Sequence, residues 1–248
     1  MKARVGLCGF SMAMARYPFP VVEVQSTFYD PPPDNVIAKW PRSLEYTMKV
    51  WQLVTHAAGS PTYRRLKKPL GRRERPGFFR NSKSVQRGWQ RSLECAQMLS
   101  ATALLFQCPA SFRPEREHIR NMTRFFERIE RPRARLLWEP RGTAWVEQRD
   151  LALSLCRDLD LVYVVDPFVT PPHRRHPVYW RLHGISGPRY SYTLRDLRAL
   201  RRMLLDAEAP GTAYVMFNNL PRVGDAKRFH NLPPSPRGRG SRGGAPRR

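Results

Sequence analysis

The sequence has few cysteines, no long apolar run and few acidic residues. Its four cysteines include no Cys-x-x-Cys pair, so a disulfide framework is not indicated, and buried reduced thiols favour a cytoplasmic location. No stretch approaches the ~18 apolar residues that a membrane-spanning helix needs, so no membrane partner is expected. Acidic residues number 20 against 44 basic ones, which leaves a formal net charge of +24.

This charge predicts an anionic partner, with nucleic acid as the leading candidate. The alternative is a compositional bias towards arginine that has no bearing on function. The charge is concentrated in a basic insertion at about 64–91, where Glu74 is the one acidic residue. Its eleven cations are Arg64, Arg65, Lys67, Lys68, Arg72, Arg73, Arg75, Arg80, Lys83, Arg87 and Arg91. Gly71, Pro76 and Gly77 favour a loop here over a continuous helix.

The C-terminal end is a second basic segment. We predict that residues 231–248 form a disordered Arg/Gly/Pro tail, because PPSPRGRGSRGGAPRR has five arginines and no side chain able to build a core. Removing its +5 from +24 leaves +19 on residues 1–232. The predicted folded domain, residues 1–230, is therefore basic as well.

Eight short apolar runs, each ending in polar residues, dominate that domain. They are VGLCGF, VVEVQST, EYTMKVWQ, TALLFQC, RLLWEPR, VYVVDPF, VYWRLHG and AYVMFNN. Parallel strands buried on both faces have this pattern, and in a parallel barrel the site forms at their C-terminal ends. With 248 residues, 41% of them hydrophobic, the chain matches one (β/α)8 barrel of about 250 residues.

Segments with helical spacing of apolar residues alternate with these runs. They are 85–100, 114–129, 145–159 and 193–207, the last with Thr193 as a suitable N-cap. The alternation predicts βαβ units and an α/β, TIM-barrel-like fold. We expect irregularity in two places, because residues 11–20 are too few for a crossover helix and the third connection, 53–99, is overlong.

Polar side chains at the run ends predict a site at the barrel mouth. Residues two apart on a strand share a face, so Glu139 and Arg141 point together, as do Arg181 and His183. We predict Glu139, His183 and Asp166 as catalytic residues, with proton exchange between the first two. The predicted substrate-binding residues are Glu23, Thr27, Lys49, Gln107, Arg141, Trp145, Arg181, Tyr190 and Asn218, with both arginines suited to clamp a phosphate or carboxylate.

Two other interpretations stay open. The cluster could be an internal ion-pair lattice, with Glu139 on one arginine and Asp166 on the other. A divalent metal is also open, because Glu23, Glu139, Asp166 and His183 form a hard-cation set, although no HExxH-type motif supports it. The sequence indicates no other cofactor and no oligomeric state.

Nine motifs are spread from Val5 to Phe229, namely VGLCGF, VEVQSTFY, KVWQLVTH, PTYRR, LLFQCPASF, WEPRGTAW, VVDPF, YWRLHG and FNN. Together they resemble the domain of unknown function 72 (YecE-like) family, in particular its archaeal-type members. The resemblance implies a TIM-barrel-like fold with a polar pocket but no reaction. The matching polar positions are Glu23, Thr27, Lys49, His56, Gln107, Glu139, Arg141, Trp145, Asp166, Arg181, His183 and Asn218. Many members have a longer first connection and a His where this chain has Gly142.

Three hypotheses about function follow. The first is a hydrolase or lyase that acts on a phosphate-bearing, nucleic-acid-like substrate at the barrel mouth, by general acid–base or metal-assisted chemistry. The second is a nucleic-acid-binding protein without catalysis that uses its basic insertion and tail. The third is a sugar-phosphate or other small-molecule enzyme whose basic surface plays no part in the site.

Overall fold

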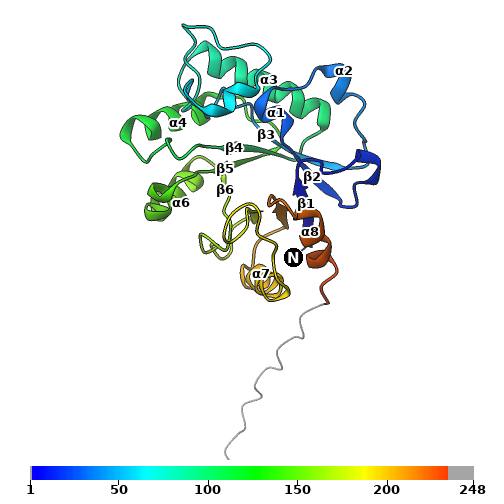
Figure 1. Ribbon diagram of the computed structural model, residues 1–248. Helices are drawn as coiled ribbons and strands as arrows, with labels where there is room; N and C mark the ends of the chain where they lie inside the picture. The colour runs from blue at the N-terminus through cyan, green and yellow to red at the C-terminus, as the bar shows by residue number, and fades with distance from the viewer. Residues whose placement is uncertain (1, 234–248) are drawn as a thin grey trace, which may run out of the picture.

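The computed structural model of the protein describes residues 2–233 and contains a ring of parallel strands surrounded by helices (Figure 1). The strands are β1 (Lys2–Cys8), β2 (Val21–Val24), β3 (Glu45–Lys49), β4 (Ala103–Gln107), β5 (Arg135–Glu139), β6 (Val162–Tyr163), β7 (Tyr179–Leu182) and β8 (Thr212–Phe217). Their order is β6-β5-β4-β3-β2-β1-β8-β7, and a parallel bridge between Val165 and Trp180 joins the two ends. Every apolar run contributes a strand, and the predicted TIM-barrel-like fold is confirmed.

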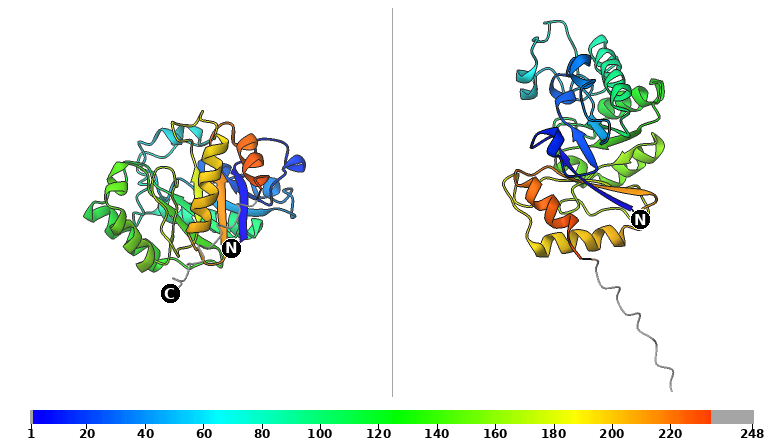
Figure 2. Two further views of the ribbon diagram at one scale, coloured as in Figure 1. Left: turned by 90° about the horizontal axis from the view of Figure 1, so that it is seen from below. Right: turned by 90° about the vertical axis from the view of Figure 1, so that its right-hand side faces the viewer.

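Helices cover the outside of this barrel. They are α1 (Ser26–Tyr29), α2 (Asp34–Ile37), α3 (Lys83–Leu99), α4 (Arg116–Arg128), α5 (Thr143–Glu147), α6 (Arg149–Asp158), α7 (Leu194–Asp206) and α8 (Arg222–His230), with 3₁₀ turns η1 (Met14–Arg16) and η2 (Pro61–Arg65). In Figure 2, α7 and α8 lie together beside β8 and β1, while α3 and α4 lie at the other end of the molecule.

The four predicted helical segments are present with small differences. The 85–100 and 114–129 segments form α3 and α4, and Thr193 caps α7 through a reciprocal pair of hydrogen bonds with Asp196. The 145–159 segment is two helices, α5 and α6, because the backbone leaves the helical conformation at Gln148. The first connection holds one 3₁₀ turn and no crossover helix, as its length predicts.

Inside the barrel, apolar side chains form a layer between two polar ones. Alternate residues point inward, and the apolar layer consists of Cys8, Val21, Ala103, Leu105, Leu137, Val164, Tyr179, Tyr214 and Met216. Beneath it, at the strand N-termini, Arg4 pairs with Glu45 at 2.9 Å. The opposite residues of the same strands, such as Leu104, Trp138 and Phe217, pack outward against the helices. The apolar layer therefore seals the barrel below its mouth.

One stretch differs from the sequence-based expectation. The VVEVQST run predicts a strand with Glu23, Gln25 and Thr27 on one face, but strand β2 ends at Val24 and Thr27 lies in α1. The basic insertion is irregular from residue 66 to 82 and helical from Lys83 onward. Of the predicted tail, residues 234–248 lie outside the described part of the chain. Within residues 2–233, none of the helices combines the length and apolar character needed to cross a bilayer.

Candidate active site at the barrel mouth

Arg181 is the centre of a polar cluster at the strand C-terminal ends. Its side chain is 0% exposed, and its guanidinium contacts both Glu23 and Glu139. Nη2 and Nε lie 2.8 and 3.1 Å from Glu23 Oε1, and Nη1 donates to Glu139 Oε2 and, at 3.3 Å, to Gln107 Oε1. One buried cation therefore joins strands β2, β4, β5 and β7.

Glu23 is held by further hydrogen bonds on the barrel interior. The Tyr179 hydroxyl lies 2.8 Å from Glu23 Oε2 and 2.7 Å from Thr47 Oγ1, and the Gln25 amide donates to Glu23 Oε1. Glu23 itself is 0% exposed. Its carboxylate is thus fully engaged by the protein, which suits a structural anchor.

His183 forms the solvent-facing side of the cluster with Arg141. The side chain of His183 is 21% exposed and that of Arg141 is 35% exposed. Nε2 of His183 lies 3.1 Å from Glu139 Oε1 and 2.8 Å from Arg141 Nη2, and its Nδ1 lies 2.9 Å from Asn218 Nδ2. The imidazole is therefore held on both nitrogens while its side chain stays partly exposed to solvent.

The electrostatics separate the roles of Glu139 and His183. Burial alone would raise the pKa of Glu139, but Arg141, Arg181 and His183 outweigh it and hold that pKa well below its ordinary range. Burial lowers the pKa of His183, Glu139 opposes this, and the two arginines add to it. At neutral pH the site thus holds an ionised carboxylate beside a neutral imidazole.

Asp166 fixes the backbone at the join between the β6 and β7 regions. Its Oδ2 accepts from the His183 amide at 2.8 Å, and its Oδ1 accepts from the Phe168 amide at 3.1 Å. Burial raises its pKa despite these two bonds. Asp166 pairs with neither arginine, so the interpretation in which it balances one of them is wrong. Its position is that of a group orienting His183 through the backbone.

Lys49 ends β3 at the mouth and is 3% exposed. Its Nζ lies 3.7 Å from the centroid of the Phe28 ring. Thr27 helps to fix this corner, because its hydroxyl donates to the Lys49 carbonyl at 2.8 Å. Burial, reinforced by Arg181, lowers the pKa of Lys49 to about 7 although Glu23 opposes the change.

His56 packs against the Phe28 ring. The two rings meet edge to face at 4.9 Å, and His56 Nδ1 lies 2.8 Å from Thr55 Oγ1. Burial and then the charge of Lys49 lower the pKa of His56 to about 3. The imidazole is therefore neutral across the physiological range and forms an apolar wall of the Lys49 corner.

Most predicted site residues meet at the mouth, but two aromatic ones lie away from the cluster. The Trp145 indole donates to the Phe112 carbonyl and packs edge to face on Trp138 at 4.9 Å, beneath the strand ends. The Tyr190 hydroxyl donates to Asp196 at 2.7 Å, next to the α7 cap. The structure brings together Glu23, Lys49, Gln107, Glu139, Arg141, Arg181, His183 and Asn218, with Asp166 and Thr27 directly behind them.

Sequence reasoning missed Tyr179 and Thr47 as polar residues of the barrel interior. Tyr179 is two residues before Arg181, and Thr47 is two residues before Lys49. The alternation of a strand, already used for Arg181 and His183, would have placed both inside the barrel.

The carboxylates of the mouth face guanidinium groups. Among residues 2–233 no three His, Cys, Asp or Glu side chains are grouped as metal ligands would be. Glu23 and Glu139 point to Arg181, and Asp166 binds backbone amides. The four residues considered as a hard-cation set are thus not directed at a common centre.

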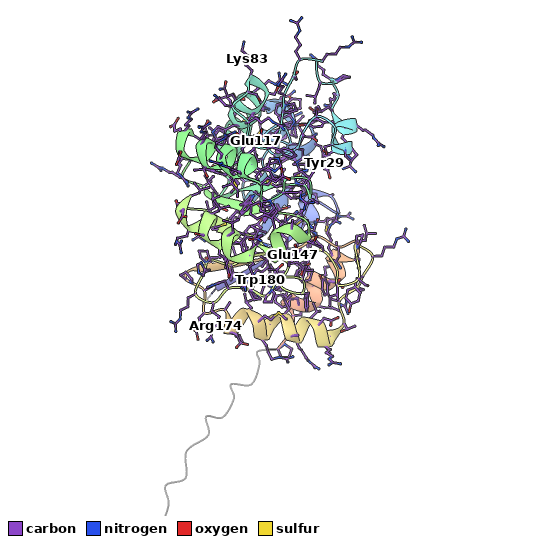
Figure 3. All side chains as sticks on the ribbon, turned by 90° about the vertical axis from the view of Figure 1, so that its left-hand side faces the viewer. Tyr29, Lys83, Glu117, Glu147, Arg174 and Trp180 are labelled. Atoms are coloured by element: carbon purple, nitrogen blue, oxygen red, sulfur yellow. The ribbon has the colours of Figure 1, made fainter. Side chains whose placement is uncertain are left out.

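The basic insertion borders the mouth through η2. The Tyr63 hydroxyl donates to the His56 carbonyl at 2.6 Å, and the Arg65 guanidinium lies 4.2 Å from the centroid of the Tyr29 ring. The exposed cations of residues 64–75 are Arg64, Arg65, Lys67, Lys68, Arg72, Arg73 and Arg75. Figure 3 shows long side chains projecting outward at this end, where Lys83 is labelled, with Arg174 at the opposite end.

Comparison with known proteins identifies the family. Residues 11–232 match the family model described as a protein of unknown function, DUF72. The chain belongs to the DUF72 family. A DUF72 protein from Thermotoga maritima is similar in structure, with a TM-score of 0.67 and 19% sequence identity, covering 93% of this chain and 98% of that one. A search of curated proteins gave no match.

Two solved structures outside the family share the barrel. A D-tagatose 3-epimerase-like protein gives a TM-score of 0.59 at 12% identity, over 92% of this chain and 95% of that one. A xylose isomerase domain containing protein from Salmonella typhimurium gives 0.55 at 14% identity, over 92% and 93%. At such identities the likeness concerns the fold of this DUF72 member alone.

Proposed function

We propose that this DUF72 member is an enzyme that performs general acid–base chemistry on a phosphate-bearing substrate at its barrel mouth, with a sugar phosphate as the favoured class. The observation that carries the proposal is the pair of partners around Nε2 of His183. Without a proton, Nε2 accepts from Arg141 Nη2 at 2.8 Å, and with a proton it donates to Glu139 Oε1 at 3.1 Å. Nε2 therefore keeps a hydrogen-bond partner with or without a proton, and when it carries the proton Nδ1 is left as the acceptor of the ring.

In this proposal His183 is the group that exchanges a proton with the substrate. Glu139 is too strongly held by two arginines to serve as the base itself, and it balances the imidazolium that forms. A substrate hydroxyl that replaces the Asn218 amide at Nδ1 comes within hydrogen-bond reach of the ring. Asp166 keeps the His183 backbone in place.

Arg141 provides the reason to expect an anionic substrate. Its Nε is buried and has no hydrogen-bond partner among the described residues, although its Nη2 contacts Glu139 and His183. A buried donor without an acceptor is costly, and a phosphate oxygen would satisfy it. The exposed cations of η2 and the following loop raise the local concentration of such a substrate.

The size of the exposed area favours a small molecule over a polymer in the mouth. Arg181, Glu23 and Glu139 are buried, and solvent reaches the cluster at His183 and Arg141. The fold adds support for a sugar-derived substrate, because the D-tagatose 3-epimerase-like and xylose isomerase domain proteins share this barrel.

The test is hydrogen exchange at substrate carbon. A panel of aldose and ketose phosphates is incubated with the protein in D2O and followed by proton NMR. We expect deuterium to enter at a carbon next to the carbonyl of at least one member, and His183→Asn to lower the rate by about 10²–10⁴. His176→Asn, the same change on an exposed loop, is the matched control. Equal exchange by wild type and His183→Asn would refute the role of His183.

The basic insertion favours a second function, nucleic-acid binding on the outer surface. Its seven exposed cations within residues 64–75 make no salt bridge in the described structure, in contrast to Arg87 and Arg91, which pair with Glu74, Asp34 and Glu94. Unpaired surface cations at this density support binding to a phosphate backbone that weakens as salt rises.

A further inference from the structure

Lys49 is a buried amine without a partner. It is 3% exposed, yet among residues 2–233 it has neither an ion pair nor a side-chain hydrogen bond. Both nearby glutamates are already engaged, Glu23 by Arg181 and Tyr179, and Glu139 by Arg181 and Arg141. Buried charged groups are almost always paired, so an unpaired lysine at a site calls for a chemical explanation.

The type of residue is informative as well. The chain has 37 arginines and seven lysines, and the other cations of the cluster, Arg141 and Arg181, are arginines. Arginine keeps its proton in proteins, whereas a lysine that is buried next to other cations loses it and becomes a nucleophile. A lysine is thus placed at the one buried position where the cation has no counter-ion in the described structure.

The surroundings of Nζ match what a reactive amine needs. Nζ lies over the face of the Phe28 ring, and His56 packs against that ring. Burial lowers the pKa of Lys49, and the charges of Arg181 and Arg141 add to this against those of Glu23 and Glu139. The same corner is fixed by the hydrogen bond from Thr27 to the Lys49 carbonyl. The amine is therefore desolvated, held in position and directed at the mouth.

We propose that Lys49 forms an imine with the carbonyl carbon of the substrate, which makes the substrate an open-chain aldehyde or ketone carrying a phosphate. This inference rests on the proposed function, because it assigns the reacting group of the same ligand. Nζ attacks the carbonyl carbon, a proton moves from nitrogen to oxygen, and the resulting carbinolamine loses water to give C=N. Amine and carbonyl thus become imine and water, with no oxidant or reductant consumed.

An imine at Lys49 has a defined consequence for the proton chemistry. When the imine nitrogen is protonated, it withdraws electrons from the neighbouring carbon and makes the hydrogen there acidic. Removal of that hydrogen is general base chemistry of the kind proposed for His183. The lowered pKa of Lys49, about 7, leaves about half of the amine free at neutral pH, against about one part in 2,500 for an exposed lysine.

The experiment is reductive trapping on the wild-type protein. Glyceraldehyde 3-phosphate is added at pH 7, borohydride converts any imine to a secondary amine, and tryptic peptides are mapped by mass spectrometry. A modified Lys49 blocks cleavage after it and gives peptide 43–64 with the added mass. We expect Lys49 to be trapped at least 100-fold faster than exposed Lys83 or Lys227, and phosphate-free glyceraldehyde to react more slowly.

Two further measurements make the outcome decisive. Calorimetry with the same sugar phosphate after Lys49→Met, checked by its melting temperature, separates binding from imine formation. Sugar phosphates that bind wild type while Lys49 stays unmodified would overturn the imine and leave the proposed function intact. Absence of both binding and trapping across the panel would overturn both. If Lys49 is trapped no faster than Lys83, the modification reflects the general reactivity of surface amines, and the imine proposal is overturned as well.

Discussion

Arg181 on β7 and Glu23 on β2 meet across the barrel interior, with Nη2 of the guanidinium 2.8 Å from Oε1 of the carboxylate and both side chains 0% exposed. The same guanidinium also binds Glu139. Removing this guanidinium would leave Glu23 without a counter-ion in a low-dielectric interior and Glu139 with Arg141 alone. Arg141 contacts Glu139 as well, at 3.1 Å, but from the solvent side. The two arginines on one carboxylate thus differ in burial.

This difference predicts unequal stability losses from the same substitution. Arg181→Met should lower the free energy of unfolding by about 3–5 kcal/mol, the range for breaking a buried ion pair from one side. Arg141→Met should lower it by less than about 1 kcal/mol, because its side chain is 35% exposed and its charge is partly screened by water. Urea unfolding of both variants at pH 7 measures the contrast. Similar small losses would show that the Arg181 network is not a structural anchor.

The barrel and most of its mouth follow from the sequence because strand alternation is local. Arg181 and His183, two residues apart, share a face wherever the strand lies, and each run ends in polar residues at the same barrel end. Partner choice is not local: Asp166 binds backbone amides and not an arginine because the β6 to β7 turn places the His183 amide 2.8 Å away. Trp145 was assigned to the mouth from its place after a run, whereas α5 turns its indole towards Phe112.

The depressed pKa of His56, about 3, predicts a pH-dependent stability contribution. A histidine ordinarily titrates near pH 6.5, so between about pH 6.5 and 3 His56 is protonated in the unfolded chain and neutral in the folded chain. Stability therefore falls as the pH drops through this window, by up to about 1.4 kcal/mol per pH unit for one group. Urea unfolding of wild type and His56→Gln from pH 7 to 4 isolates the contribution of His56 to the pH dependence of stability. If the free energy of unfolding depends on pH in the same way in both proteins, the prediction is wrong.

The backbone contact of Gly77 with His56 holds the basic insertion against the barrel mouth. The φ of Gly77 is +84°, and a Cβ placed there would lie 2.2 Å from the carbonyl carbon of His56, which is backbone and cannot yield. Gly77→Ala should cost at least about 2 kcal/mol from strain and overlap. It should also speed tryptic cleavage within residues 64–75. Gly71→Ala, whose Cβ would meet only the Glu74 side chain at 3.7 Å, is the control and should change stability by less than about 0.5 kcal/mol.

The basic insertion should dominate the salt dependence of nucleic-acid binding. Serine substitution of Arg64, Lys67 and Lys68 removes three exposed cations beside the mouth, and serine substitution of Arg195, Arg198 and Arg202 removes three exposed cations from α7 at the other end of the molecule. The two variants of the full chain carry the same net charge, so they differ in where the charge was lost.

If the insertion contacts the phosphate backbone, the first variant should reduce the slope of log affinity against log salt by about 2, because each phosphate contact on single-stranded RNA contributes about 0.7. The α7 variant should keep the wild-type slope. Fluorescence anisotropy with labelled single-stranded RNA over a salt series measures both. Equal losses would mean that binding follows net charge and not the insertion, because a long-range field depends on the total charge whereas counterion release depends on which cations touch the phosphates.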